Sequence, residues 1–120
     1  MKKTWHIASI ELKNPLVLAP MAGYTDSPYR RICKRFGAGL LYSDLISSLG
    51  VCFNNGKTMH MLERHPEEYP LNLQLFGAIP EKMAFAAKTI QDKGFHLVDI
   101  NMGCPRSEEH TSELQSLSHL

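Results

Sequence analysis

Short apolar runs alternate with segments of helical spacing along the chain, and this alternation constrains the fold more than any other feature of the sequence. The expected strands are residues 16–19, 40–43, 71–76 and 97–101, and the clearest expected helices are residues 28–36 and 80–93. Because strands joined by helices pair side by side through right-handed crossovers, the pattern predicts an α/β fold with a parallel sheet. Residues 5–13 are expected to form a small hairpin ahead of this sheet.

The first expected strand and the first helix carry specific expectations. Residues 16–19 are apolar throughout, which is typical of a strand that is buried on both faces. Ser27 is the expected N-cap of the following helix, and Gly37 is expected to end it. One side of this helix has the spacing of a core-facing stripe, and the other side is basic and expected to be solvated. These sides comprise Tyr29, Ile32, Cys33 and Phe36, and Arg30, Arg31, Lys34 and Arg35.

The middle of the chain and the second clear helix are less regular. Residues 45–69 carry weak helical patterns around residues 45–50 and 58–64, with a turn at residues 54–56. Ile79 stands at the N-cap of the helix at residues 80–93, where it offers no hydrogen-bond acceptor. This helix is therefore expected to begin about 1 kcal/mol less stably than it would after Asp or Ser.

The composition is that of one soluble domain, and it argues against several functional classes. The 120 residues are 43% hydrophobic and 21% charged with a net charge of +1, so no polybasic patch for nucleic acid or membrane is expected. Cys33, Cys52 and Cys104 form no C-x-x-C pair, which argues against a disulfide framework or a structural zinc site. No apolar run is long enough for a signal peptide or a membrane span. We expect a cytoplasmic protein without a metal site.

The loops that follow the expected strands are the candidate functional region, because parallel α/β sheets bind ligands at the carboxyl ends of their strands. Cys104 follows the last expected strand and lies between Gly103 and Pro105. A thiol with the ordinary pKa of about 8.5 is protonated at neutral pH, so it is a usable proton donor as well as a nucleophile. The alternative is that Cys104 is a small buried hydrophobic residue.

Four segments, in this order, resemble the N-terminal half of a bacterial-type tRNA-dihydrouridine synthase. They are residues 16–26 (LVLAPMAGYTD), 36–40 (FGAGL), 73–77 (LQLFG) and 99–105 (DINMGCP). The resemblance covers about residues 5–105 and implies a flavin-dependent (β/α)8 TIM barrel followed by a C-terminal helical domain. On this basis the chain is expected to supply a partial barrel, about the first four βα units, preceded by the small hairpin.

The resemblance also implies a reaction and the residues that perform it. In the family, NADPH reduces FMN, the reduced flavin gives a hydride to C6 of a uracil ring in tRNA, and a cysteine supplies the proton at C5. Cys104 matches this general acid, and Asn101 matches the asparagine that contacts the uracil. The alternative for Asn101 is that it caps the turn after the strand.

The implied cofactors are FMN and NADPH, and the flavin contacts are carried over in the same way. Pro20, Met21 and Ala22 match the segment that lies along the flavin, and Gln74 matches a side chain that hydrogen-bonds the isoalloxazine edge. The alternative for Gln74 is a polar group that the protein itself satisfies inside the barrel. Asp44 departs from the family pattern, which more often has Glu at this position.

Residues 106–120 are expected to be a non-native tail, because residues 106–116 resemble one reading frame of a common sequencing-library adapter. Residues 1–105 are then the N-terminal part of a flavin-dependent barrel, and the truncated chain is expected to be inactive by itself. In the full-length enzyme we expect tRNA as the partner, a monomeric state, and no membrane or metal. Two alternatives stay open from the sequence: a dihydroorotate- or dihydropyrimidine-type flavin dehydrogenase, and a non-enzymatic partial barrel.

Overall fold

The structure is a computed structural model that describes residues 3–103. Its elements, in chain order, are β1 (Trp5–Ile7), β2 (Ile10–Leu12), α1 (Ser27–Arg35), β3 (Leu41–Ser47), α2 (Ser48–Cys52), α3 (Gly56–Met61), the 3-10 turn η1 (Pro66–Glu68), β4 (Leu71–Phe76), α4 (Pro80–Asp92) and β5 (Val98–Ile100). Cys104 and residues 105–120 lie outside the described residues. The division at residue 105 therefore stays a prediction.

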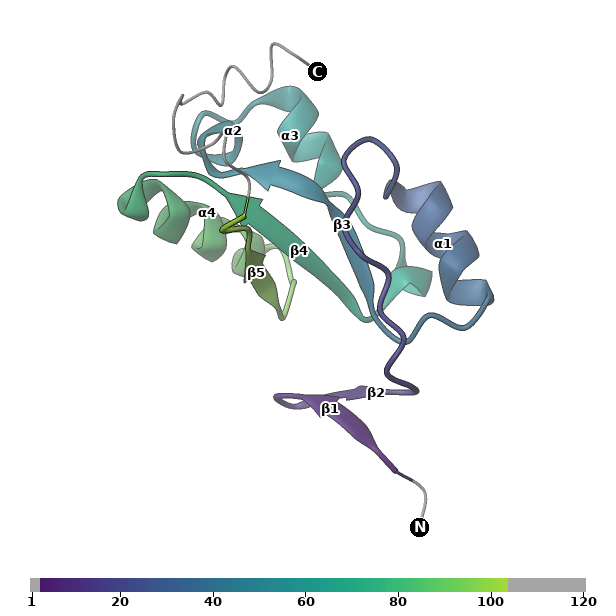
Figure 1. The fold of residues 1–120 in the computed structure, drawn as a ribbon. Helices are drawn as coiled ribbons and strands as arrows, with labels where there is room; N and C mark the ends of the chain where they lie inside the picture. The colour runs from purple at the N-terminus through teal and green to yellow at the C-terminus, as the bar shows by residue number, and fades with distance from the viewer. Residues whose placement is uncertain (1–2, 104–120) are drawn as a thin grey trace.

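The predicted α/β class and parallel sheet are confirmed (Figure 1). Strands β3, β4 and β5 are neighbours in that order and run parallel, and β1 and β2 form the predicted antiparallel hairpin. Helices α2 and α3 connect β3 to β4, and α4 connects β4 to β5. This is the arrangement of the first part of a (β/α)8 barrel.

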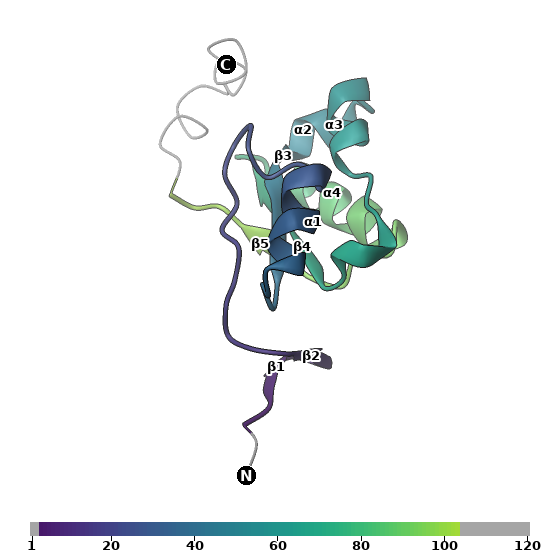
Figure 2. The ribbon, with the colours of Figure 1, turned by 90° about the vertical axis from the view of Figure 1, so that its right-hand side faces the viewer.

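The helices cover one face of the sheet and leave the other face without a helix (Figure 2). The covered face forms the main core with α4 and α2, and its buried members include Leu41, Ile46, Val51, Leu73, Leu75, Ala86 and Ile90. Because side chains alternate along a strand, Asn72 and Gln74 of β4 face the other way. The face without a helix would be the interior of the barrel, and it carries the polar residues of the candidate site.

A second, smaller core joins the hairpin to the sheet. Ile10 and Leu12 of β2 are buried against Leu40, and Tyr42 and Leu97 pack on the same cluster. The hairpin lies at the end of the sheet where β3 and β4 begin (Figure 1). The opposite end, where the strands finish, is therefore left for the loops that carry the candidate functional residues.

The prediction of a first strand buried on both faces is wrong. Residues 16–19 form one isolated parallel bridge, between Val17 and Leu40, with Leu18 N donating to Leu40 O at 2.9 Å. Leu16 is 63% exposed and Val17 is 48% exposed. Among the described residues this segment has a neighbour on one side only, so Leu16 and Val17 are exposed, while Leu18 packs against the main core.

The predicted cap of α1 is also wrong, and of the predicted core-facing side only Cys33 packs against the main core. Asp26 rather than Ser27 is the N-cap, and its Oδ1 accepts from Tyr29 N at 3.0 Å. Ile32 is 53% exposed and Phe36 is 89% exposed, whereas Arg30, expected on the solvated side, is buried. Arg30 is turned inward because it has an anionic partner there, whereas Arg35 of the same side is exposed.

That partner is Glu68 of η1. Arg30 Nε donates to Glu68 Oε1 at 2.8 Å, and both side chains are almost fully buried. Arg30 Nη1 donates to Thr25 O at 2.6 Å, and the other oxygen of Glu68 accepts from His65 N. A buried ion pair of this kind is tolerated when further hydrogen bonds satisfy both partners, and here they do. The pair ties α1 and the loop before it to η1, which is distant in sequence.

The remaining expectations are confirmed in part. Strand β4 and helix α4 lie where they were predicted, and Ile79 makes no side-chain cap bond to α4. The helical pattern expected at residues 45–50 begins later, at Ser48, because β3 continues through Ser47 in register with Phe76. Pairing with β4 thus overrides the local helical preference. Among residues 3–103, no helix has the length and apolar character that a membrane span requires.

Replacing Glu68 with Ala should leave the Arg30 guanidinium buried without its counter-charge. We expect the free energy of unfolding to fall by about 3–5 kcal/mol, measured by urea denaturation. Glu67→Ala is the matched control, because it removes the partner of the exposed Arg35, where water screens the charges. A loss in Glu68→Ala no larger than the loss in Glu67→Ala would contradict the central role of the buried pair.

Candidate functional site

The ends of β4 and β5 bring three polar side chains together on the face of the sheet without helices. Gln74 lies opposite Asp99 in the parallel register, and its Nε2 donates to Asp99 Oδ2 at 2.5 Å. Asn101 Nδ2 donates to Gln74 Oε1 at 3.1 Å. Two of the residues predicted from the sequence, Gln74 and Asn101, are therefore in direct contact.

The protein itself supplies hydrogen-bond partners to both amides. Gln74 has a partner at each end of its amide, as the structural alternative for this residue proposed. Asn101 Oδ1 accepts from Gly103 N at 2.9 Å, so Asn101 also caps the turn that follows β5. These contacts hold the two side chains in place near the carboxyl ends of β4 and β5.

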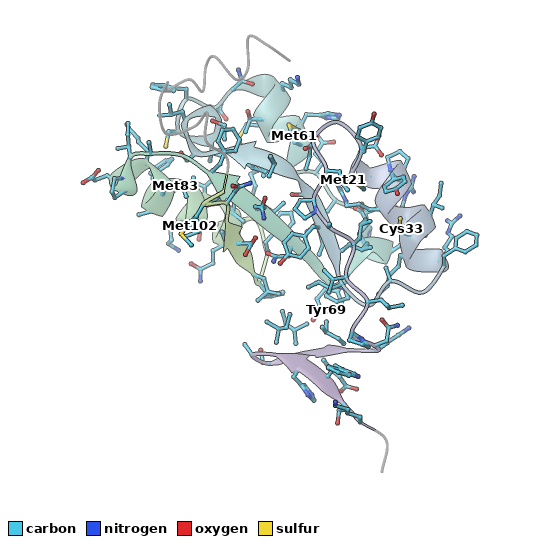
Figure 3. The ribbon with its side chains drawn as sticks, in the orientation of Figure 1. Met21, Cys33, Met61, Tyr69, Met83 and Met102 are labelled. Carbon is cyan, nitrogen blue, oxygen red and sulfur yellow. The ribbon has the colours of Figure 1, made fainter. Side chains whose placement is uncertain are left out.

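Residues 20–25 form a tight loop between the isolated bridge and α1, and they present the predicted flavin-wall segment. Met21 N donates to Thr25 Oγ1 at 3.1 Å, and Thr25 N donates to Met21 O at 3.1 Å, with Thr25 fully buried. Met21, labelled in Figure 3, lies on this loop. It is 37% exposed, Pro20 is half-buried and Ala22 is exposed. The loop thus exposes the apolar side chain of Met21, and hydrogen bonds to Thr25 hold its backbone in place.

Asp44 of β3 anchors this loop. Its Oδ2 accepts from Gly23 N at 2.8 Å, and its Oδ1 accepts from Leu45 N at 2.7 Å. Gly23 has a φ of +81°, a conformation that favours glycine at this turn. The sequence singled out Asp44 only as a departure from a family pattern. The signal for its role was that Asp44 is the one charged residue of β3.

Tyr42 and Asn72 extend the polar face toward the start of the strands. The pKa of Tyr42 is raised, mainly by burial of the phenol and then by repulsion from the Asp99 carboxylate, against a smaller opposing effect of a hydrogen bond with Asn72. Tyr42 therefore stays a neutral phenol at physiological pH. Sequence reasoning missed Tyr42 and Asp99 as members of this face, although Asp99 lies within the segment that carried the resemblance.

The predicted residues do not form one closed site among the described residues. Strands β3 and β4 separate Met21 from the end of β5, beyond which Met102 lies (Figure 3). In the part of the chain that the structure describes, no hydrogen bond joins the Met21 loop to Gln74. Cys104 lies outside the described residues. Within residues 3–103, no group of three or more His, Cys, Asp or Glu is placed to hold a metal ion.

A cavity of about 540 Å³ lies elsewhere, between α1, α3 and the segment that follows α3. Charged side chains line much of it, and it shares Thr25 and Asp44 with the site described above. Pro20, Met21, Ala22 and Gln74 do not line this cavity. The candidate site is therefore an open sheet face with its loops.

Comparison with known proteins places these residues in a family context. The family model described as "Dihydrouridine synthase (Dus)" matches residues 17–115, so the match runs past Pro105 into the predicted tail. A "tRNA-dihydrouridine synthase B" of Pasteurella multocida is 43% identical over 99 residues, which cover 82% of this chain and 30% of the relative.

Two further relatives carry the same name. The protein of Shewanella oneidensis is 42% identical over 99 residues, covering 82% of this chain and 31% of the relative. That of Xanthomonas campestris pv. campestris is 43% identical over 90 residues, covering 75% of this chain and 27% of the relative. The chain thus spans about 30% of the length of the curated relatives that it matches.

Asp44→Ala should release the loop that carries Met21, because Gly23 N and Leu45 N both lose a charged acceptor. We expect faster hydrogen exchange at the Gly23 amide and a loss of about 1–3 kcal/mol in the free energy of unfolding. Asp44→Glu is the control, since it keeps a carboxylate and is the residue that the resembling family more often has. Unchanged exchange at Gly23 in Asp44→Ala would show that Asp44 does not anchor the loop.

Proposed function

The chain belongs to the dihydrouridine synthase family, and we propose that it supplies the first part of the catalytic barrel of an enzyme that reduces uridine in tRNA to 5,6-dihydrouridine. The family match over residues 17–115 carries this proposal. The contact between Gln74 and Asn101 at adjacent strand ends supports it, because ligands of such barrels bind where the strands end.

The proposed cofactor is FMN, reduced by NADPH, and the residues present fit it. Gln74 has two N–H donors and two acceptor lone pairs on its amide. Asp99 takes one donor and Asn101 takes one lone pair, which leaves one of each for a ligand. A donor beside an acceptor complements the C=O and N–H groups on the pyrimidine edge of an isoalloxazine. The exposed, apolar Met21 and its neighbours Pro20 and Ala22 fit the wall along such a ring.

The reaction adds a hydride and a proton across the C5–C6 double bond of uracil. FMN, when bound, supplies the hydride that is added to C6. In the proposed mechanism the Cys104 thiol gives its proton to C5 and is left as a thiolate, which solvent must reprotonate. Asn101 holds the uracil ring through its polar groups. A general acid of this kind contributes about 10²- to 10⁴-fold to the rate.

The proposed partner and setting follow from the substrate. We assign tRNA as the macromolecular substrate of the full-length enzyme and place the enzyme in the cytoplasm as a monomer. Three relatives are named for a tRNA-dihydrouridine synthase, which supports the choice of tRNA.

A chimaera tests the proposed function. Residues 1–105 of this chain would replace the matching part of the Pasteurella multocida relative, in a strain that lacks its own synthase. We expect the chimaera to restore dihydrouridine in tRNA, measured by mass spectrometry of nucleosides, and Cys104→Ala to lower the rate by about 10²-fold or more. Cys52→Ala is the control. Full activity of Cys104→Ala, or no dihydrouridine with the unmodified chimaera, would contradict the proposal.

These 120 residues by themselves are expected to be inactive, because they span about 30% of the length of the relatives that they match. Phosphate-binding loops of such barrels commonly follow the seventh and eighth strands. We expect the purified chain to hold no FMN and to reduce no uridine, checked by its absorption spectrum and by assay with tRNA. A yellow protein with a flavin spectrum would contradict this expectation.

A further inference from the structure

Asp99 stands at the start of a series of hydrogen bonds that runs along the end of the sheet. Its Oδ2 accepts from Gln74 Nε2 at 2.5 Å, Gln74 Oε1 accepts from Asn101 Nδ2 at 3.1 Å, and Asn101 Oδ1 accepts from Gly103 N at 2.9 Å. Each of the two amides is therefore bonded at both its nitrogen and its oxygen. Gly103 is the last described residue, and Cys104 follows it.

The chemistry of a carboxylate gives this series one direction. An ionised carboxylate accepts hydrogen bonds and donates none, so only the Nε2 end of Gln74 can face Asp99. Gln74 Oε1 then faces Asn101, which must present Nδ2. Asn101 Oδ1 is thereby turned toward Gly103 N. Reversing the Gln74 amide would set its oxygen against the carboxylate and its nitrogen against Asn101 Nδ2, so both of its hydrogen bonds would be lost.

Asp99 bonds to the Gln74 amide and has no cationic partner among the described residues. Asp99 is at the centre of β5, where the register sets it opposite Gln74, and Val98 beside it packs against the main core. Among the described residues, no Lys, Arg or His forms an ion pair with Asp99. Tyr42, whose phenol is neutral, is the titratable group that its charge affects. The carboxylate therefore acts on an amide rather than on a cation.

We propose that Asp99 is a positioning residue that sets the amide orientation of Gln74 and, through Gln74, that of Asn101 and the backbone leading to Cys104. The meaning of this orientation rests on the proposed function, in which the free donor and acceptor of Gln74 meet a ligand. Reversal of the Gln74 amide would exchange that donor and acceptor. Asp99 thus fixes which end of the Gln74 amide offers a donor to the ligand and which end offers an acceptor.

The test measures side-chain amides in the isotopically labelled 120-residue chain by NMR. In Asp99→Asn the new amide can present either its oxygen or its nitrogen to Gln74, so the orientation is no longer imposed. We expect the Gln74 side-chain amide protons to exchange about tenfold faster, as for loss of a charge-assisted bond. The Asn101 side-chain amide and Gly103 backbone amide signals should shift as well.

Asp92→Asn is the matched control, because it removes the same charge from an exposed position on α4, where Asp92 pairs with Lys88. It should leave the Gln74, Asn101 and Gly103 signals unchanged. The backbone signals of β4 should be unchanged in both variants. Collapse of the β4 and β5 signals in Asp99→Asn would overturn the proposal, because Asp99 would then hold the sheet itself together.

A second substitution tests whether the effect travels through Gln74. With Gln74→Leu in the background, adding Asp99→Asn should cause no further shift at Asn101 or Gly103. Equal shifts with and without Gln74→Leu, or no shift at all in Asp99→Asn, would overturn the relay. None of these signals depends on flavin or tRNA, so their failure is distinguishable from failure of the chimaera to make dihydrouridine.

Discussion

The buried ion pair between Arg30 and Glu68 determines how α1 and the loop before it sit on the sheet. Arg30 reaches Glu68 at 2.8 Å and Thr25 O at 2.6 Å, so one guanidinium joins a helix, a loop and a distant 3-10 turn. Desolvating two charges is costly, and the pair is stable only because every contact is made at once. The ion pair also positions the loop that carries Met21, because Thr25 is hydrogen-bonded to Met21 as well as to Arg30.

Two further carboxylates use the same physical device at the candidate site. Asp44 accepts from two backbone N–H groups and holds the Met21 loop to β3, and Asp99 accepts from Gln74 and orients the amides at the ends of β4 and β5. Charge-assisted hydrogen bonds to amides are stronger than neutral ones and are directional. Each of the two parts of the site is thus held in place by a carboxylate that accepts hydrogen bonds from the protein.

Sequence patterns predicted the sheet better than they predicted which sides of the elements would be buried. Strand β4 and helix α4 follow the pattern closely. Strand β4 lies between β3 and β5, and α4 packs its apolar side into the main core, so the apolar positions of both elements find a surface to bury against. In α1, by contrast, Phe36 has the spacing of a core residue yet is 89% exposed, while Arg30 is buried. Periodicity identifies an apolar stripe, but burial requires a partner surface, and the pattern carries no information about that surface. Gln74 and Asn101 were predicted singly, and their contact depends on strand pairing.

The sequence by itself determined the order of strands and helices, the parallel sheet and the family, because local periodicity and short motifs are properties of neighbouring residues. The tertiary structure decided which charges are buried, where β3 ends, and that Asp99, Gln74 and Asn101 form one directed series of hydrogen bonds. These features join residues that are 25 to 38 positions apart in the chain. Which acceptor meets which donor over such a separation is set by strand register and by packing of helices on the sheet.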